Sequence, residues 1–292
     1  MIPAAFEYLR AHSVDEAFAH LQRYGGDARI LAGGQSLIPA MRFRLARPAV
    51  LVDINAVREL SYLRPNGKVL AIGAIARDSD IERASWIGER RWSLLHDVSR
   101  VVADPVVRQM GTVVGSLCHN DPAGDWTATA LAARAEVIVR GKAGTRTVAI
   151  DDFLVDSFST AVGEGEMALA VHFPVPDDRA AGSYQKIERK VGDFATAAAA
   201  VQLSLNVDGT IRSAGVALSA AGPRAVRVEE AERLLAGQKP NRDTIRAAAD
   251  AASRGSSPQA DLRGSIEYKK NLAGVLVARG LRQALARLGV QT

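Results

Sequence analysis

The segment Arg29-Ile-Leu-Ala-Gly-Gly-Gln-Ser-Leu37 predicts a short apolar strand, Arg29–Ala32, that ends directly in two glycines. Two successive glycines let the backbone turn sharply, and they let a ligand approach the N–H groups because no Cβ stands in the way. Consecutive N–H groups form an anion-binding nest, and a helix expected at Ile38–Leu45 would add its positive N-terminal end. The alternative is a tight strand-to-helix turn without a ligand, which is the commoner meaning of a single such loop. The candidate phosphate-binding residues are Ala32, Gly33, Gly34, Gln35, Ser36 and Leu37.

The residues around this loop predict a small unit in which helices and strands alternate. Ser13 followed by Glu16 is typical of a capping box, and the helix that it starts is expected to end at Gly25-Gly26. A second strand is expected at Val50–Ile54. Alternation of this kind favours parallel pairing of the strands.

A second glycine-bounded run, Gly111-Thr-Val-Val-Gly-Ser116, is expected to form another strand-and-loop element. Two such loops could hold the two phosphates of a dinucleotide. A carboxylate such as Asp125 could then bind ribitol or ribose hydroxyls, although Asp121-Pro122 could equally be a turn that opens the next helix. The first strand is not followed by GxGxxG and the chain has no GxxxxGK(S/T), which argues against a Rossmann fold and a P-loop. The candidates in this loop are Gly111, Thr112, Val113, Val114, Gly115 and Ser116.

The remainder of the chain predicts two further units. A hairpin with an Asn66-Gly67 turn and a helix-rich stretch at Asp78–Val102 open the second unit, and Pro174–Gly182 is the best linker to the third. The fold class is therefore α+β with three domains, expected at residues 1–56, 57–177 and 178–292. The other expected elements are a helix at Thr127–Ala133, strands at Glu136–Arg140, Arg146–Ile150, Met167–Phe173, Ser183–Lys190, Ala195–Val207 and Thr210–Ser219, and helices at Val228–Leu235, Arg242–Ser253 and Ile266–Leu288.

The composition is that of an ordinary globular protein, with 292 residues of which 48% are hydrophobic and 24% charged. The net charge of +5 is scattered along the chain and aromatic residues make up only 5%, which argues against nucleic-acid binding. The N-terminus places Pro3 and Glu7 where a signal peptide needs basic and apolar stretches, and no uncharged run approaches the ~20 residues of a membrane helix. We therefore expect a cytoplasmic protein without a membrane span.

Cys118 is the only cysteine, which limits the redox chemistry that the chain can perform alone. One thiol forms no internal disulfide and cannot supply the ligands of an iron–sulfur cluster, so an electron carrier on this chain has to be an organic cofactor. Cys118 and His119 are adjacent, and in a strand their side chains would point in opposite directions. The five histidines show no metal-ligand spacing, so we expect no metal site, and we interpret Cys118 as a packed small residue.

Several motifs are distributed along the whole chain. They are Pro3-x-x-Phe6-x-Tyr8, Leu31-Ala-Gly-Gly-Gln-Ser-Leu-Ile-Pro39, Leu51-Val-Asp-Ile54, Asp104-Pro-x-Val-Arg108-x-x-Gly-Thr112, Asp121-Pro122-x-x-Asp125, Tyr184-x-Lys186-x-x-Arg189-x-x-Gly-Asp193-Phe-Ala195 and Asp261-Leu-Arg-Gly-Ser-x-Glu-Tyr-Lys269. In this order they resemble the FAD-binding medium subunits of molybdenum hydroxylases, the xanthine dehydrogenase family. Within that family they are most similar to the flavoprotein subunits of aerobic carbon monoxide dehydrogenases.

This resemblance implies that the chain binds FAD in a fold of the vanillyl-alcohol-oxidase (PCMH) type, followed by a C-terminal antiparallel sheet with helices. The two loops, Ala32–Leu37 and Gly111–Ser116, would wrap the FAD pyrophosphate. Asp125 would contact the ribityl–phosphate region, and Lys186 would approach the flavin from across the domain cleft. The family performs no substrate chemistry in this subunit, so the resemblance implies no catalytic residue in this chain.

The same resemblance implies partner subunits and an oxidoreductase complex. A large molybdopterin subunit would oxidise the substrate, a small subunit with two [2Fe–2S] clusters would relay electrons, and FAD would pass them to an external acceptor. The assembly would be a heterohexamer, a dimer of heterotrimers. Carbon monoxide, an N-heterocycle or an aldehyde all remain open as the substrate, and a quinone, NAD⁺ or another compound as the acceptor.

The second loop departs from the pattern of the family, which reads Thr-Ile-Gly-Gly, because Val114 stands in place of a glycine. Its Cβ would lie where the backbone nears the cofactor, so the loop could sit further from FAD or bind it differently. Two alternatives therefore stand beside an electron-transfer subunit. One is a free-standing flavin oxidase or reductase of the same fold, which would need an acid or base beside the flavin. The other is a scaffold subunit that has lost FAD.

Overall fold

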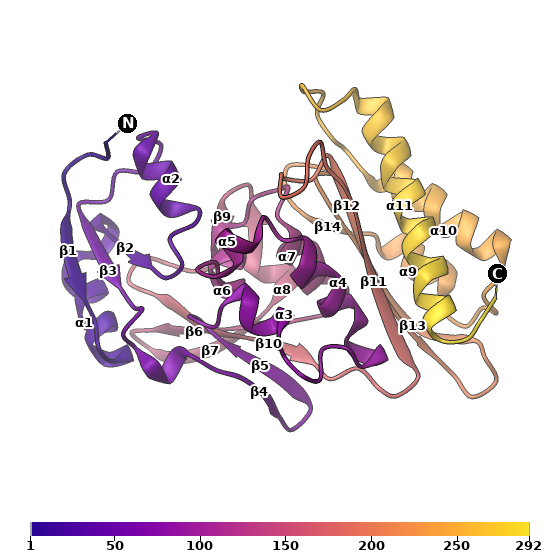
Figure 1. The fold of residues 1–292 in the computed structure, drawn as a ribbon, viewed down its shortest axis with the longest axis horizontal. Helices are drawn as coiled ribbons and strands as arrows, with labels where there is room; N and C mark the ends of the chain where they lie inside the picture. Colours follow the sequence, from indigo (N-terminus) through magenta and orange to yellow (C-terminus); the bar gives the residue numbers. More distant parts are fainter. Residues whose placement is uncertain (1, 292) are drawn as a thin grey trace.

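The computed structural model describes residues 2–291, in which three main β-sheets follow one another along the long axis of the molecule (Figure 1). The first sheet is parallel, and the second and third are antiparallel. Helices cover the sheets and fill the space between the second and the third. The arrangement confirms the α+β fold class.

The first sheet has the strand order β1-β3-β2 and is parallel throughout, as the alternation of elements predicts. β1 is a strand that the sequence analysis misses, because three of its four residues are exposed and it shows no apolar pattern. The elements of this unit are β1 (Glu7–Arg10), α1 (Val14–Tyr24), β2 (Ala28–Leu31), α2 (Leu37–Arg42) and β3 (Val50–Asp53).

α1 begins where the sequence predicts, because the Ser13 Oγ accepts a hydrogen bond from the Glu16 N–H at 3.1 Å. The Glu16 carboxylate accepts from the backbone N–H of His12 at 2.8 Å, one residue before the position that a capping box uses. The helix ends at Gly25, whose φ of 50° suits a residue without a Cβ. The cap and the glycine together fix the length of the helix that covers this small sheet.

The second sheet, β4-β5-β10-β6-β7, joins strands that are far apart in the sequence. Its central strand, β10 (Met167–Pro174), pairs with β5 (Val69–Gly73) on one side and with β6 (Glu136–Gly141) on the other. The predicted hairpin is present, but Asn66 is the last residue of its strand and Gly67, at φ 64°, begins the turn. The other elements of this region are β4 (Leu63–Asn66), α3 (Asp78–Glu82), α4 (Ser93–Val101), α5 (Pro105–Arg108), α6 (Val113–His119), α7 (Asp125–Ala132), β7 (Gly144–Ala149), α8 (Ile150–Phe153), β8 (Leu154–Asp156) and β9 (Ser159–Thr160).

The run Gly111–Ser116 is not the strand-and-loop element that its β-branched residues predict. Thr112 is instead the N-cap of α6, since its Oγ1 accepts a hydrogen bond from the N–H of Gly115 at 3.1 Å. Val113 and Val114 form the first turn of this helix and are buried. The side-chain cap and the burial of the two valines override their intrinsic preference for strands.

The third sheet is an antiparallel meander of β11 to β14, and α9, α10 and α11 cover its outer face (Figure 1). The predicted linker is shorter than expected, because β10 continues through Pro174 and the next strand already begins at Ala180. The elements are β11 (Ala180–Ile187), β12 (Ala197–Leu205), β13 (Ile211–Ser219), β14 (Val226–Arg227), α9 (Glu229–Leu235), α10 (Arg242–Gly255) and α11 (Ile266–Arg287).

β12 shows how the third sheet takes part in two cores. Ala198 and Ala200 belong to the main core, which continues through the second sheet into the first unit. Val201 and Leu203 belong to a separate core under the outer helices. Because successive side chains of a strand point to opposite faces, one strand supplies both cores, and small alanines on the inner face let α4 and α7 pack closely.

α11 is 22 residues long, but charged residues interrupt its apolar positions. Within residues 2–291, none of the helices has the length and apolar character needed to cross a membrane.

Candidate functional site

The two glycine-rich loops predicted from the sequence lie directly against each other. A Cβ placed on Gly33 would come within 2.2 Å of the backbone oxygen of Met110 and 3.0 Å of the Gly111 Cα. Only a glycine permits so close an approach of two backbones. The structure thus brings together two segments that are almost eighty residues apart in the sequence.

The first loop presents a run of free backbone donors. Among residues 2–291, the N–H groups of Gly33, Gly34, Gln35 and Ser36 donate no hydrogen bond to another residue. Gly34 has a φ of +74°, which L side chains rarely adopt, and this conformation turns the chain from β2 into α2. Unpaired consecutive N–H groups at the start of a helix are the arrangement that binds phosphate oxygens.

A polar clamp behind the first loop was not found by the sequence analysis. The Asn55 Nδ2 donates to the Ala32 carbonyl at 2.9 Å, and the Arg77 Nη2 donates to the Asn55 Oδ1 at 2.6 Å. The Arg77 Nη1 also donates at 2.7 Å to the carbonyl of Met110, the residue directly before the second loop. One guanidinium therefore ties both loops together, and burial lowers its pKa.

The second loop has two free donors and a capped helix start. Within residues 2–291, the N–H groups of Thr112 and Val114 donate no hydrogen bond, whereas that of Gly115 is taken by the Thr112 Oγ1. The side chain of Val114 is 2% exposed and belongs to the main core. The valine that departs from the family pattern thus packs inward, so its side chain does not cover the outer surface of the loop.

The glycines of both loops are required for a reason other than the one expected. We expected the missing Cβ atoms to leave room for a ligand. In the structure a Cβ on Gly33 would meet Met110, one on Gly111 would lie 2.4 Å from the Asp78 Oδ2, and one on Gly115 would lie 2.5 Å from the Thr112 Oγ1. Their space is filled by neighbouring protein atoms, and the loops owe their shape to that packing.

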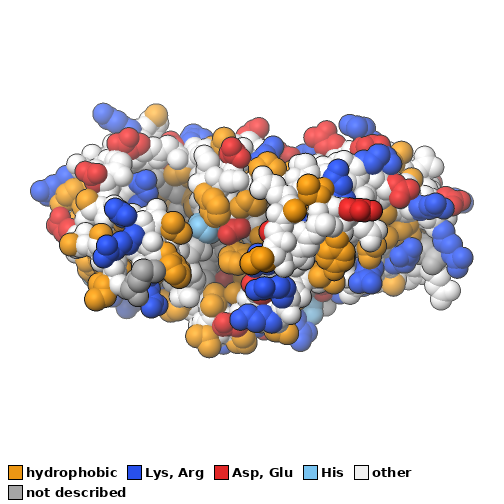
Figure 2. Space-filling model, turned by 90° about the horizontal axis from the view of Figure 1, so that it is seen from above, with side chains coloured by type: hydrophobic (Ala, Val, Ile, Leu, Met, Phe, Trp, Pro, Cys, Tyr) orange, Lys and Arg blue, Asp and Glu red, His pale blue; other side chains and the backbone are white. Residues whose placement is uncertain are grey.

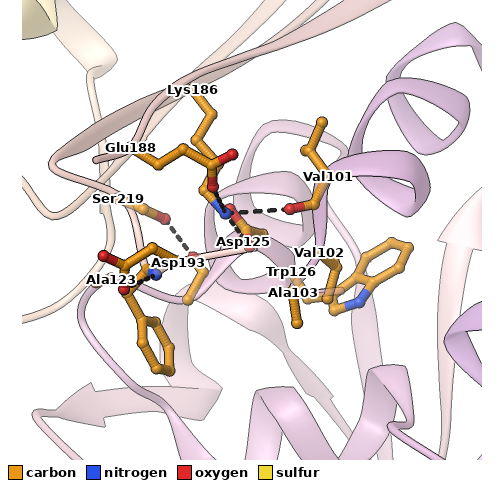
Figure 3. A network of polar contacts seen from close by, with 12 residues as sticks. Val101, Val102, Ala103, Ala123, Asp125, Trp126, Lys186, Glu188, Asp193 and Ser219 are labelled. Atoms are coloured by element: carbon orange, nitrogen blue, oxygen red, sulfur yellow. Dashed lines mark hydrogen bonds and ion pairs between the residues drawn. The ribbon is translucent and has the colours of Figure 1, made fainter. Parts of the chain in front are cut away.

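Asp125 and Lys186 face each other in a buried network between the second and third units (Figure 3). The Lys186 Nζ, on β11, donates to the Asp125 Oδ2 and to the Val101 carbonyl, each at 3.1 Å. The Tyr184 hydroxyl donates to the Asp125 Oδ1 at 2.7 Å, and a Glu188 oxygen lies 3.2 Å from the Lys186 Nζ. Both predicted residues are thus present at one place, each held chiefly by the other.

The charges of this network are strongly desolvated. Burial raises the pKa of Asp125, and Lys186 opposes that rise by its positive charge and its hydrogen bond. Burial also raises the pKa of Tyr184 well above its usual value, as does the carboxylate that it contacts. The tyrosine therefore stays protonated, and it acts as a hydrogen-bond donor to Asp125.

Figure 2 shows a hollow between the first unit and the middle of the molecule, where Figure 1 places α2 on one side and α5 and α6 on the other. The helices beside it carry exposed apolar side chains. Ile38 on α2 is 44% exposed, and Val106 on α5 is 80% exposed. Concave surfaces with apolar walls and a few polar donors are the usual form of cofactor sites.

Cys118 and His119 are part of α6, and the strand geometry expected for them is wrong. Burial raises the pKa of the Cys118 thiol to about 12, so the thiolate is absent at neutral pH. The His119 ring packs against Phe158 with centroids 5.1 Å apart. Cys118 is in contact with the main core and has the character of a packing residue.

Two family descriptions match this chain, one on each side of the start of the third sheet. Residues 4–176 match the family described as "FAD binding domain in molybdopterin dehydrogenase", and residues 182–284 match "CO dehydrogenase flavoprotein C-terminal domain". The chain belongs to the FAD-binding medium subunits of the molybdenum hydroxylase family. The resemblance noted in the sequence, the fold type and the FAD cofactor are thereby confirmed.

Individual relatives agree with this membership over their whole lengths. The carbon monoxide dehydrogenase medium chain of Hydrogenophaga pseudoflava is 38% identical, covering 98% of this chain and 99% of the relative. The glyceraldehyde dehydrogenase medium chain of Sulfolobus acidocaldarius is 33% identical, covering 97% and 99%. The solved carbon monoxide dehydrogenase from Hydrogenophaga pseudoflava superposes with a TM-score of 0.94, covering 98% of this chain and 99% of that chain at 38% identity. Quinoline 2-oxidoreductase from Pseudomonas putida 86 gives a TM-score of 0.90 over 100% of both chains at 30% identity.

Proposed function

We propose that this chain holds one non-covalent FAD at the two loops and serves as the electron-transfer subunit of a molybdenum hydroxylase complex. The observation that carries the proposal is the row of free N–H groups from Gly33 to Ser36, set against the free donors of Thr112 and Val114. Donors of this number and spacing suit the oxygens of a pyrophosphate.

In this proposal the protein supplies binding, position and electrostatics, while FAD supplies the redox chemistry. The N–H groups of the two loops hold the pyrophosphate. Arg77 holds the loops against each other through the Met110 carbonyl and Asn55, and its positive charge would favour the binding of phosphates there. No side chain of this chain is assigned a role in substrate chemistry.

Asp125 and Lys186 would contribute from the side of the third unit. Both oxygens of Asp125 already accept hydrogen bonds, one from Tyr184 and one from Lys186. A contact with the ribityl–phosphate region would therefore use a carboxylate whose position is fixed beforehand. Lys186 would act mainly by holding that carboxylate and by closing the cleft between the units.

The partners in the proposal are a small subunit with [2Fe–2S] clusters and a large molybdopterin subunit, in a cytoplasmic dimer of heterotrimers. The names of several relatives support a complex, for example "6-hydroxypseudooxynicotine dehydrogenase complex subunit alpha" and "Nicotine 6-hydroxylase medium subunit". Electrons would enter this chain from the clusters and leave for an external acceptor such as a quinone or NAD⁺. The substrate pocket would lie on the large subunit.

The test is reconstitution from separately purified subunits. The chain alone should bind one FAD that acid precipitation releases into the supernatant, and carbon monoxide, N-heterocycles or aldehydes should not reduce it. Adding the two partner subunits should restore reduction. A chain that turns over a substrate alone is a free-standing flavoenzyme, and a chain that takes up no FAD is a scaffold subunit; either result overturns the proposal.

A further inference from the structure

Asp78 is a buried carboxyl directly behind the second loop. It is the first residue of α3 and is 1% exposed. Its Oδ1 accepts a hydrogen bond from the Trp126 Nε1 at 2.9 Å, and its backbone N–H donates to the Gly111 carbonyl at 3.0 Å. Asp78 thus contacts the start of the second loop through its backbone, and it contacts α7 through its side chain.

The Asp78 carboxylate also fills the space that a side chain at position 111 would need. A Cβ on Gly111 would lie 2.4 Å from the Asp78 Oδ2, and its next neighbour would be the Val107 carbonyl at 3.2 Å. Gly111 does not have a positive φ, so its φ alone does not require a glycine. The glycine is therefore required chiefly because Asp78 stands behind it.

Trp126 extends this contact toward the third unit. The indole is 1% exposed and follows Asp125, whose carboxylate binds Lys186 on β11. A continuous series of contacts therefore runs from Gly111 through Asp78 and α7 to the third sheet. The charged groups that face Asp78 are Arg77 and Arg108, which are cationic, and Asp125, which is anionic.

We infer that Asp78 is a positioning residue of the FAD site, fixing the second loop by filling the space behind Gly111 while Trp126 holds its carboxyl in place. The inference rests on the proposed function, because it takes the Gly111–Ser116 loop as an FAD-binding loop. It implies that a methyl group added at Gly111 weakens FAD binding because it collides with Asp78, and not because it touches FAD.

A double-mutant cycle on the full chain tests this claim. Gly111→Ala, Asp78→Ala and the double variant are titrated with FAD, and binding is followed by flavin fluorescence and by the visible flavin spectrum. Gly111→Ala should weaken FAD binding roughly tenfold or more, and the double variant should regain most of that loss, since the two side chains compete for one space. Asp78→Asn, which keeps the size and the acceptor for Trp126, should bind more tightly than Asp78→Ala.

Gly88→Ala serves as the matched control, because a Cβ there meets no atom within 4 Å and Gly88 has no positive φ. Alone it should bind FAD as the wild type does, and combined with Asp78→Ala it should bind FAD as the Asp78→Ala variant does. If Gly111→Ala does not fold, a folded double variant that binds FAD gives the same support. A double variant that binds FAD no better than Gly111→Ala overturns the inference while leaving the proposed function intact. A wild-type chain that binds no FAD overturns both.

Discussion

The Asp125 Oδ2 and the Lys186 Nζ lie 3.1 Å apart, with only 7% and 4% of their side chains exposed. This ion pair joins α7 of the second unit to β11 of the third, and Tyr184 and the Val101 carbonyl complete its hydrogen bonds. Two charges removed from water in this way gain little net free energy, but either one left alone is costly. The pair therefore enforces the relative position of the two units.

Removing one charge of the pair should be more harmful than removing both. We expect Lys186→Met to lower the free energy of unfolding by about 3–5 kcal/mol, because Asp125 then stays buried without a cation. The double variant Asp125→Asn/Lys186→Met should recover part of this loss in denaturant titrations. Arg254→Gln is the control, since its ion pair with Glu230 is largely exposed and should contribute less than about 1 kcal/mol. If the single and the double variant lost the same free energy of unfolding, the two charges would not be stabilising each other.

The stability of the chain should depend on pH through Asp78. Burial raises its pKa from 3.8 to about 7, so its contribution to stability is fully present below pH 3.8 and is lost as the pH rises through about 7. Asp78→Asn should therefore be more stable than wild type at pH 8, by up to about 4 kcal/mol at roughly 1.4 kcal/mol per pKa unit. The gain should shrink as the pH falls toward 5. Thermal unfolding at several pH values measures this gain in stability, and Asp250→Asn, at an exposed position, is the control. A gain that does not depend on pH would contradict a raised pKa for Asp78.

Gly33→Ala should disturb both loops at once. The new Cβ would lie 2.2 Å from the Met110 carbonyl oxygen, which is backbone and cannot move aside cheaply. We expect FAD binding to weaken roughly tenfold or more, accompanied by a loss of stability of about 1–3 kcal/mol from overpacking. Equilibrium dialysis and thermal unfolding check the two effects, with Gly88→Ala as the harmless counterpart. Full retention of FAD would show that the contact between the loops does not matter for binding.

The segment Arg42–Arg47 should contact a partner subunit. Phe43 and Leu45 are 64% and 85% exposed there, next to several arginines. We expect Phe43→Ser/Leu45→Ser to keep FAD but to weaken assembly with the partner subunits roughly tenfold or more, since exposed apolar anchors dominate such interfaces. Size-exclusion chromatography of mixed subunits measures this. Val207→Ser, also highly exposed but in the third unit, should assemble normally, and normal assembly of the double variant would place the interface elsewhere.

Much of the fold could be predicted from local patterns. The parallel first unit, the hairpins and the outer helices of the third unit follow from alternation, turn residues and amphipathic faces. β1 was missed because its residues are mostly exposed, and α6 was predicted as a strand because Val113 and Val114 are β-branched. In both cases the decisive factor is tertiary structure: β1 pairs with β3, and the two valines are buried in the core from the first turn of α6.

The site could be predicted only in part, because some of its residues are marked by a local pattern and others only by tertiary contacts. The loops are visible in the sequence because glycines are concentrated in them. Asn55, Arg77 and Asp78 cannot be recognised in this way, because each contacts a segment 23 to 48 residues away. A single sequence does not reveal such approaches. The one available signal was the position of Asn55, a polar residue just beyond the end of an apolar strand.

The middle sheet cannot be completed until β10 has been synthesised. Until residues 167–174 have been synthesised, the middle sheet consists of two separate hairpins, β4–β5 and β6–β7, whose inner edges have no partner. Unpaired edges invite wrong association, so more than half of the chain must emerge before this region is protected. A fragment cut before Met167 would keep those open edges, whereas one cut between Val175 and Arg179 would contain all five strands of the sheet. The last strand of the middle sheet thus determines when its two hairpins can pair.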